Sequence, residues 1–202
     1  MTHKFFTEKR PHNGFTFEEY SDNLKTFVDN TNPQNLPEND IKLFEFTKLN
    51  IYRSNRAVKT YKPSEEILTA VSKINSEQIW MILTEGWCGD SAQTLPYIYM
   101  MTKGNPNIKL RILLRDSNLD IMDKYLVNGK SRSIPRLVIF DVSGNELALW
   151  GPRPAAAQKI VDDLKAEGKD MHEIHEKLHL WYGRNRGKSI ESEFLDIVKG
   201  FG

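Results

Sequence analysis

Hydrophobic residues recur at helical spacing in the first third of the chain. They return every three or four positions in residues 15–29 and again from residue 40 to about residue 61, and this period predicts two helices. The stretch between them, residues 30–39, contains two prolines and four asparagines and is typical of a loop. Pro63, Ser64 and two glutamates then mark a third helix, because acidic side chains favour the positive end of the helix dipole.

The pattern changes near residue 78 to short apolar runs that are typical of strands. Residues 78–84 form a continuous apolar run, as expected for a strand that is buried on both faces of a sheet. Residues 108–114 predict a second strand. Residues 136–141 and 146–150 predict two more, joined by a Val-Ser-Gly-Asn turn that signals a hairpin.

Helical patterns separate and follow these strands. A strand–helix–strand order implies a parallel pair, and the hairpin adds an antiparallel edge. The sequence therefore predicts an α/β fold with a central mixed sheet flanked by helices, and with additional helices at both ends. The helices are expected after residue 88 to about residue 103, and at about 119–127, 155–167, 170–182 and 190–200.

The length of 202 residues suits one domain with extensions. We expect a core over about residues 63–168, an N-terminal helical extension over 1–60 and a C-terminal one over 169–202. Both extensions have apolar faces that must pack on something. We expect the two extensions to pack together along one side of the core.

Charge and composition exclude several classes of partner. The chain has 28 Lys and Arg against 27 Asp and Glu, and this balance gives no electrostatic reason to bind nucleic acid or an anionic membrane. The N-terminus lacks the apolar segment of a signal peptide, and the longest apolar runs are too short to span a bilayer. We therefore expect a cytoplasmic protein that binds neither nucleic acid nor membranes.

Cys88 is the only cysteine, so an intramolecular disulfide and a cysteine-rich metal site are both excluded. It lies between a buried strand and a helix, where the free N–H groups and the positive end of the helix dipole would stabilise a thiolate. This placement predicts a thiol pKa below that of a free cysteine. Asp90 works partly against it, because its charge competes for the same N–H donors.

The segment from Trp87 to Ser91, Trp-Cys-Gly-Asp-Ser, resembles the Trp-Cys-Gly-x-Cys active-site segment of the thioredoxin superfamily. Pro96 stands eight residues after Cys88, where family members carry a proline that kinks the active-site helix. Pro135 precedes a strand, where the family places a cis-proline that faces the active cysteine. The resemblance covers about residues 79–168 and is closest to an uncharacterised bacterial branch with extra helices at both ends.

The resemblance implies thiol–disulfide chemistry, and one departure changes its form. Ser91 replaces the second cysteine and cannot resolve a mixed disulfide, so Cys88 would act as a monothiol nucleophile. The partners would be protein thiols and disulfides or low-molecular-weight thiols, such as glutathione or a bacterial equivalent, with no cofactor. Ser91 would stabilise the thiolate together with the Gly89 and Asp90 backbone. The substrate-binding residues would be Trp87, Gly89, Asp90, Ile134 and Pro135. Of these, Trp87, Ile134 and Pro135 would shape the groove.

Two alternatives stay open at this point. The fold could serve as a non-catalytic binding module in which Cys88 is a buried, inert residue. Ser91 could be natural, or it could be an engineered replacement.

Two further clusters invite functional interpretation. His172, His175 and His179 share a helical face, but a surface or packing role is favoured over a metal site because no ligand motif surrounds them. Arg184, Arg186 and Lys188 form a small basic segment that lacks the spacing of a phosphate-binding loop. A solvated loop is favoured there, and a contact with a phosphate or with the carboxylate of a thiol stays open.

Overall fold

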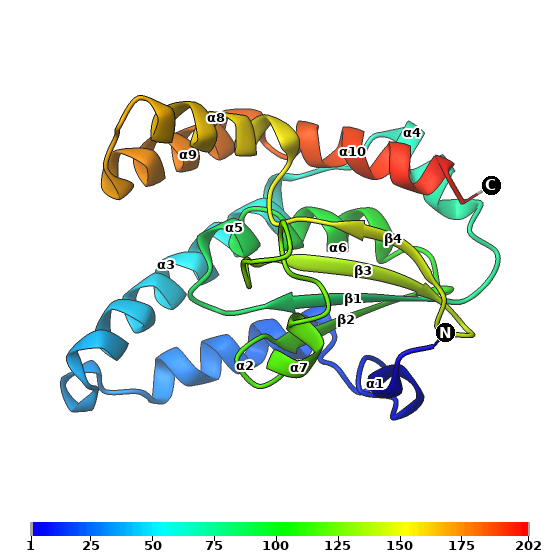
Figure 1. The fold of residues 1–202 in the computed structure, drawn as a ribbon, viewed down its shortest axis with the longest axis horizontal. Helices are drawn as coiled ribbons and strands as arrows, with labels where there is room; N and C mark the ends of the chain where they lie inside the picture. The colour runs from blue at the N-terminus through cyan, green and yellow to red at the C-terminus, as the bar shows by residue number, and fades with distance from the viewer. Residues whose placement is uncertain (1, 202) are drawn as a thin grey trace.

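The computed structural model describes residues 2–201, and a four-stranded mixed sheet lies at its centre (Figure 1). The strand order is β2-β1-β3-β4. The parallel pair is β1 (Gln78–Thr84) with β2 (Ile108–Leu114), and β1 also pairs antiparallel with β3 (Arg136–Asp141). The hairpin partner β4 (Glu146–Trp150) forms the edge. All four strands have the bounds that the sequence predicts, and every residue of β1 is buried.

Helices surround this sheet, and most of them match the sequence prediction within a few residues. The helix after Cys88 is divided in two, because Pro96 lacks the N–H that would continue the hydrogen-bond ladder across Gln93 and Thr94. The helix expected at 119–127 stops early, because Val127 turns to pair with Ser131. The bounds are α1 (Lys4–Thr7), α2 (Phe17–Asn30), the 3-10 helix η1 (Pro33–Asn35), α3 (Glu38–Thr60), α4 (Glu65–Ser72), α5 (Gly89–Ala92), α6 (Leu95–Thr102), α7 (Leu119–Met122), α8 (Ala155–Ala166), α9 (Met171–Asn185) and α10 (Lys188–Lys199).

Side chains at the helix starts explain where several helices begin. Thr16 caps α2 through a reciprocal pair of hydrogen bonds with Glu19, a capping box. Ser64 accepts a hydrogen bond from the Ile67 N–H at the start of α4. The carboxylate of Asp170 accepts one from the Glu173 N–H at the start of α9.

The two faces of the sheet carry separate apolar cores. One face, with Trp80 and Ile139, packs against α4, α6, α10 and the start of α2. The other face, with Met81 and Phe140, packs against α1 and α7. Helices α8 and α9 form a third, smaller apolar cluster between themselves. Figure 1 shows α8, α9 and α10 along the top of the molecule and α1 and α2 below the sheet.

The C-terminal helices depart from the expected arrangement. Helix α8 packs on α9, whereas α10 packs on α4 and α6. Phe194 of α10 is only 1% exposed and lies between Trp80 and Trp150, with ring centroids 5.9 and 5.2 Å apart. The apolar residues of α10 recur every four positions, and this stripe covers the sheet face that α8 leaves free.

The two terminal extensions do not form a joint layer, so that prediction is wrong. The N-terminal helices α2 and α3 pack on each other, and α3 packs on α5 and α6. Side chains of the two extensions also meet, and the Tyr61 hydroxyl donates a hydrogen bond to Glu191. Within residues 2–201, no helix is long and apolar enough to cross a bilayer.

Candidate functional site

Cys88 stands where the sheet ends and α5 begins. It is the N-cap residue of α5, and its backbone is extended, with φ −76° and ψ 113°. Its thiol is 8% exposed and donates a 3.3 Å hydrogen bond to the carbonyl oxygen of Ile134. The bond between Ile134 and Pro135 is cis, as the sequence predicts, and Pro135 is buried. The proline loop therefore faces the cysteine, in agreement with the prediction.

Ser91 lies one turn along from Cys88 and is buried. Its hydroxyl accepts a 2.5 Å hydrogen bond from the hydroxyl of Thr84, the last residue of β1. The Ser91 hydroxyl and the backbone N–H groups of Asp90 and Ser91 lie near the Cys88 sulfur and favour the thiolate. Thr84 was not a predicted site residue, and only its place at the strand end could have indicated it.

The pKa of the Cys88 thiol is raised above its ordinary value, so the expected lowering is wrong. Burial is the largest cause, because a thiolate loses its water contacts there, and the charge of Asp90 is the next. The Ser91 hydroxyl and the neighbouring backbone N–H groups act in the opposite direction but do not outweigh burial. Helix α5 has only four residues, so the dipole at its start is small.

Asp90 points away from its own helix. Its Oδ2 forms a 2.7 Å ion pair with Arg153, and its Oδ1 accepts a 2.9 Å hydrogen bond from the Tyr182 hydroxyl. Asp90 opposes the thiolate, as the sequence predicts, but it does so through its charge and not by bonding the N–H donors of α5. Burial and the Asp90 carboxylate raise the pKa of Tyr182, which stays protonated and able to donate. Neither Arg153 nor Tyr182 was identified from the sequence.

Gly89 has a role in close packing. A Cβ on Gly89 would lie 2.7 Å from Cε1 of His179 and 3.5 Å from Nη1 of Arg53, so a larger residue would collide with the imidazole. Helices α9 and α3 thus approach the residue that follows Cys88. Burial, then Arg53, His175 and Arg153, lower the pKa of His179 to about 4, so its imidazole is neutral at physiological pH.

The three histidines do not meet as a metal site. His179 packs against the site segment, while His172 and His175 are exposed. Within residues 2–201, no group of three histidine, cysteine or acidic side chains is arranged to bind a metal ion. The packing role favoured by the sequence therefore holds for His179.

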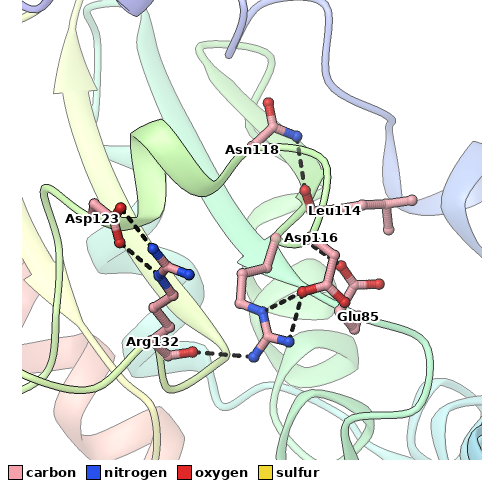
Figure 2. Close-up of polar contacts among 7 residues, drawn as sticks. Glu85, Leu114, Asp116, Asn118, Asp123 and Arg132 are labelled. Carbon is pink, nitrogen blue, oxygen red and sulfur yellow. Dashed lines mark hydrogen bonds and ion pairs between the residues drawn. The ribbon is translucent and has the colours of Figure 1, made fainter.

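Trp87 lies on the other side of Cys88 and is half-buried. Its ring stacks under the guanidinium of Arg115, 5.0 Å from the ring centroid. Arg115 is held by Asp116 at 2.7 Å and by the backbone oxygen of Arg132 at 3.2 Å (Figure 2). Glu85 accepts a 2.8 Å hydrogen bond from the Asp116 N–H in the same view, and burial raises the pKa of Glu85.

Helices α2 and α3 of the N-terminal extension border a cavity beside the cysteine. This cavity of about 100 Å³ touches Cys88 and Ser91 and lies between them, α2 and α3. Asn50 of α3 donates a 3.0 Å hydrogen bond to the carbonyl oxygen of Gly86, which fixes α3 against the loop. A wider apolar groove of about 480 Å³ runs between α2 and α3 and ends at Trp87.

The structure thus gathers most of the predicted residues around one sulfur atom. Ser91, Ile134 and Pro135 adjoin Cys88, whereas Asp90 turns toward the C-terminal helices. The substrate-binding roles assigned to Trp87 and Gly89 stay predictions. The sequence analysis did not identify the other residues from distant helices and loops that pack near the site, because no local motif marks Arg53, Arg153 or Tyr182.

Comparisons with known proteins agree with this architecture. A family model described as Thioredoxin matches residues 39–165. An HIV epitope scaffold of known crystal structure is 17% identical, with a TM-score of 0.57, and the match covers 96% of this chain and 97% of the scaffold. A protein of unknown function, PA1234 from Pseudomonas aeruginosa, is 16% identical, with a TM-score of 0.54 and coverage of 93% and 99%. These two likenesses concern the fold alone. No curated protein matches the chain.

Proposed function

Because the chain belongs to the thioredoxin family, we propose that it is a monothiol thiol–disulfide oxidoreductase in which Cys88 is the nucleophile. The observation that carries the proposal is the contact of the Cys88 sulfur with the Ile134 carbonyl beside cis-Pro135, at the start of α5. An extended substrate segment could pair with the backbone at this loop. The substrates would be mixed disulfides of proteins or of low-molecular-weight thiols.

The reaction consists of two exchange steps. The Cys88 thiolate attacks one sulfur of a substrate disulfide, forms a mixed disulfide with it and releases the other sulfur as a thiolate. A free thiol from solution, such as glutathione or a bacterial equivalent, then attacks the substrate sulfur of that mixed disulfide. This step restores Cys88 and leaves a new disulfide between the substrate and the outside thiol. The number of disulfides is conserved, so no oxidant is consumed.

Ser91 has a supporting role in this scheme. Its hydroxyl accepts a hydrogen bond from the Thr84 hydroxyl, which leaves its own O–H free to donate a hydrogen bond to the developing Cys88 thiolate. This contact lowers the thiol pKa against the effect of burial. It replaces one function of a second cysteine without supplying a resolving sulfur.

The burial of Cys88 requires that its cover moves before a disulfide can reach the sulfur. The cover includes α9, which is linked to the site through Tyr182 and His179. Helices α8 and α9 share an apolar cluster that is separate from the two sheet cores, so their displacement as a pair would leave those cores intact. We propose that substrate binding displaces this pair.

A mass-spectrometric experiment tests the proposed chemistry. The protein is incubated with glutathione disulfide, and we expect one glutathione adduct on Cys88 that disappears after addition of reduced glutathione. The Cys88→Ser variant should form none. An adduct that forms only after denaturation would overturn the proposal, since the folded site would then be closed to disulfides.

A binding module is the second candidate, and the raised thiol pKa and low exposure of Cys88 favour it. The apolar groove beside Trp87 would be its working surface, with Phe27 and Leu43 exposed along it. Under this alternative, Cys88→Ser leaves every property of the protein unchanged. Loss of disulfide exchange in that variant separates the two candidates.

A further inference from the structure

Four cationic side chains line a second cavity near the site. The cavity measures about 330 Å³ and lies between α3, α6 and the turn from α9 to α10. Its cations come from both extensions: Arg53, Arg56 and Lys62 from α3 and the residues after it, and Arg186 from the turn. No carboxylate lines it. A chain with nearly balanced charge thus concentrates positive charge at one place.

These cations have no ion-pair partner within the part of the chain that the structure describes. None of the four forms an ion pair among residues 2–201, although ten such pairs occur elsewhere. Arg53 donates only to the side-chain oxygen of Asn50, at 3.0 Å. Burial and the charge of Arg56 lower the pKa of Arg53. The positive charges around the cavity therefore repel one another. An anion bound in the cavity would reduce this repulsion.

The turn that carries Arg186 is fixed in an unusual conformation. Arg186 has φ 51°, in the left-handed region that costs energy for a residue with a side chain. Gly187 follows at φ 84°, and the ring of Tyr97 occupies the place of its missing Cβ. Tyr97 also lines the cavity. The packing of Tyr97 on Gly187 therefore holds Arg186 at the cavity edge, opposite α3.

We propose that this cavity binds a small molecule with at least two acidic groups, carboxylates or phosphates. Guanidinium groups suit both, because their planar N–H pairs match two oxygens of such a group. The aromatic walls, Tyr61 and Tyr97, supply apolar contact beside the charges. Arg53 lines the cavity and also approaches Gly89, which connects the bound anion to the segment that contains Cys88.

Isothermal titration calorimetry at low ionic strength, with two probes, distinguishes a phosphate ligand from a carboxylate ligand. Pyrophosphate represents phosphates, and S-methylglutathione represents a peptide thiol whose blocked sulfur cannot exchange with Cys88. We expect saturable binding of at least one probe, with one site per chain. Binding should weaken as salt is added, because the contacts are ionic.

One double variant and one matched control test the location. Arg56→Gln combined with Arg186→Gln removes two exposed cations of the cavity, and we expect the dissociation constant to rise about tenfold or more. Lys59→Gln removes an exposed cation of α3 that does not line the cavity, and it should bind as the wild type does. Melting curves establish that all three proteins are folded.

Three outcomes would overturn the proposal. They are failure of both probes to bind the wild type, unchanged binding in the double variant, and equal weakening in Lys59→Gln, which would indicate unspecific attraction. Cys88→Ser should retain full binding. The anion site is thereby tested separately from the disulfide chemistry, since either can fail while the other holds.

Discussion

The hydroxyl of Tyr182 donates a 2.9 Å hydrogen bond to the carboxylate of Asp90, although 92 positions separate the two residues in the sequence. Asp90 follows Cys88 by two residues, so this bond connects the C-terminal extension directly to the site. The same carboxylate is paired with Arg153; Asp90 and Tyr182 are buried, and Arg153 is partly buried. The extension thereby sets both the exposure and the charge around the thiol.

The first prediction concerns the bond itself. Tyr182→Phe removes a hydrogen bond to a charged group, and we expect a loss of about 1.5–3 kcal/mol in the free energy of unfolding. The cover over Cys88 should also loosen, so iodoacetamide should label the thiol faster. Urea titration and labelling rates measure the two effects. Tyr52→Phe is the control, since Tyr52 is 66% exposed, and it should change neither.

The second prediction concerns charge. Asp90 raises the pKa of the Cys88 thiol, so Asp90→Asn should lower it and move the inflection of labelling rate against pH toward lower pH. The variant also leaves Arg153 without its partner, and some stability should be lost. Asp29→Asn, at an exposed position of α2, should leave the inflection in place. An inflection that moves upward in Asp90→Asn would contradict the assignment.

The third prediction is a pH dependence of stability. His179 has a folded-state pKa of about 4, below its ordinary value of 6.5, so the unfolded chain binds more protons between these values. The free energy of unfolding should therefore fall as the pH drops from about 6.5 to about 4, by roughly 1–3 kcal/mol after allowance for partial exposure.

The contribution of His179 to the pH dependence is the difference between the wild type and a variant that lacks the imidazole. Denaturant titrations of the wild type and of His179→Gln at several pH values should show a shallower decline for the variant. His175→Gln, at an exposed position one turn earlier, should decline like the wild type. If stability fell with pH equally in the wild type and in His179→Gln, the pKa of His179 would not be lowered in the folded protein, and its imidazole would be charged there at acidic pH.

The fourth prediction compares the stability lost when a buried, a partly buried and an exposed side chain are each replaced by alanine. Phe194→Ala should cost about 3–5 kcal/mol, because the ring is fully buried between two tryptophans. Trp181→Ala should cost less, since Trp181 is only partly buried beside the cluster of α8 and α9. Leu180→Ala, at a site that is 53% exposed, should be nearly neutral. Thermal unfolding ranks the three variants.

The fifth prediction concerns the missing sulfur. The wild-type chain should reduce insulin poorly with dithiothreitol, because Ser91 cannot resolve a mixed disulfide. Ser91→Cys should improve the rate, since the Ser91 position adjoins the Cys88 sulfur. Ser91→Ala should remain as poor as the wild type. Strong turnover by the serine form would mean that a second thiol is not needed.

Local signals in the sequence predict the sheet and its immediate site. The continuous apolar run at β1 and the hairpin turn before β4 determine strand bounds by short-range chemistry alone. Pro135 stands directly before β3, so its position facing Cys88 follows once the order of strands is known. The interaction of Ser91 with the thiol is also local, because one helical turn brings the two side chains together.

The sign of the Cys88 pKa shift could not be predicted in this way. It depends on burial, and burial depends on α3 and α9, whose sequences contain no motif that directs them to Gly89. Arg153 stands in a Gly-Pro-Arg-Pro segment that indicates only a chain break. Long-range packing also decides that α10, and not α8, covers the sheet, because both helices have apolar stripes of similar kind.

The position of α10 along the chain has a consequence for biosynthesis. A ribosome makes β1 to β4 long before it makes Phe194, so the nascent sheet exposes the face around Trp80 and Trp150 while α8 and α9 are still being translated. Exposed apolar strands of this kind attract other chains and chaperones. The last step of folding must therefore wait until α10 has left the exit tunnel, and slow translation of residues 151–199 would prolong the interval in which this face is exposed.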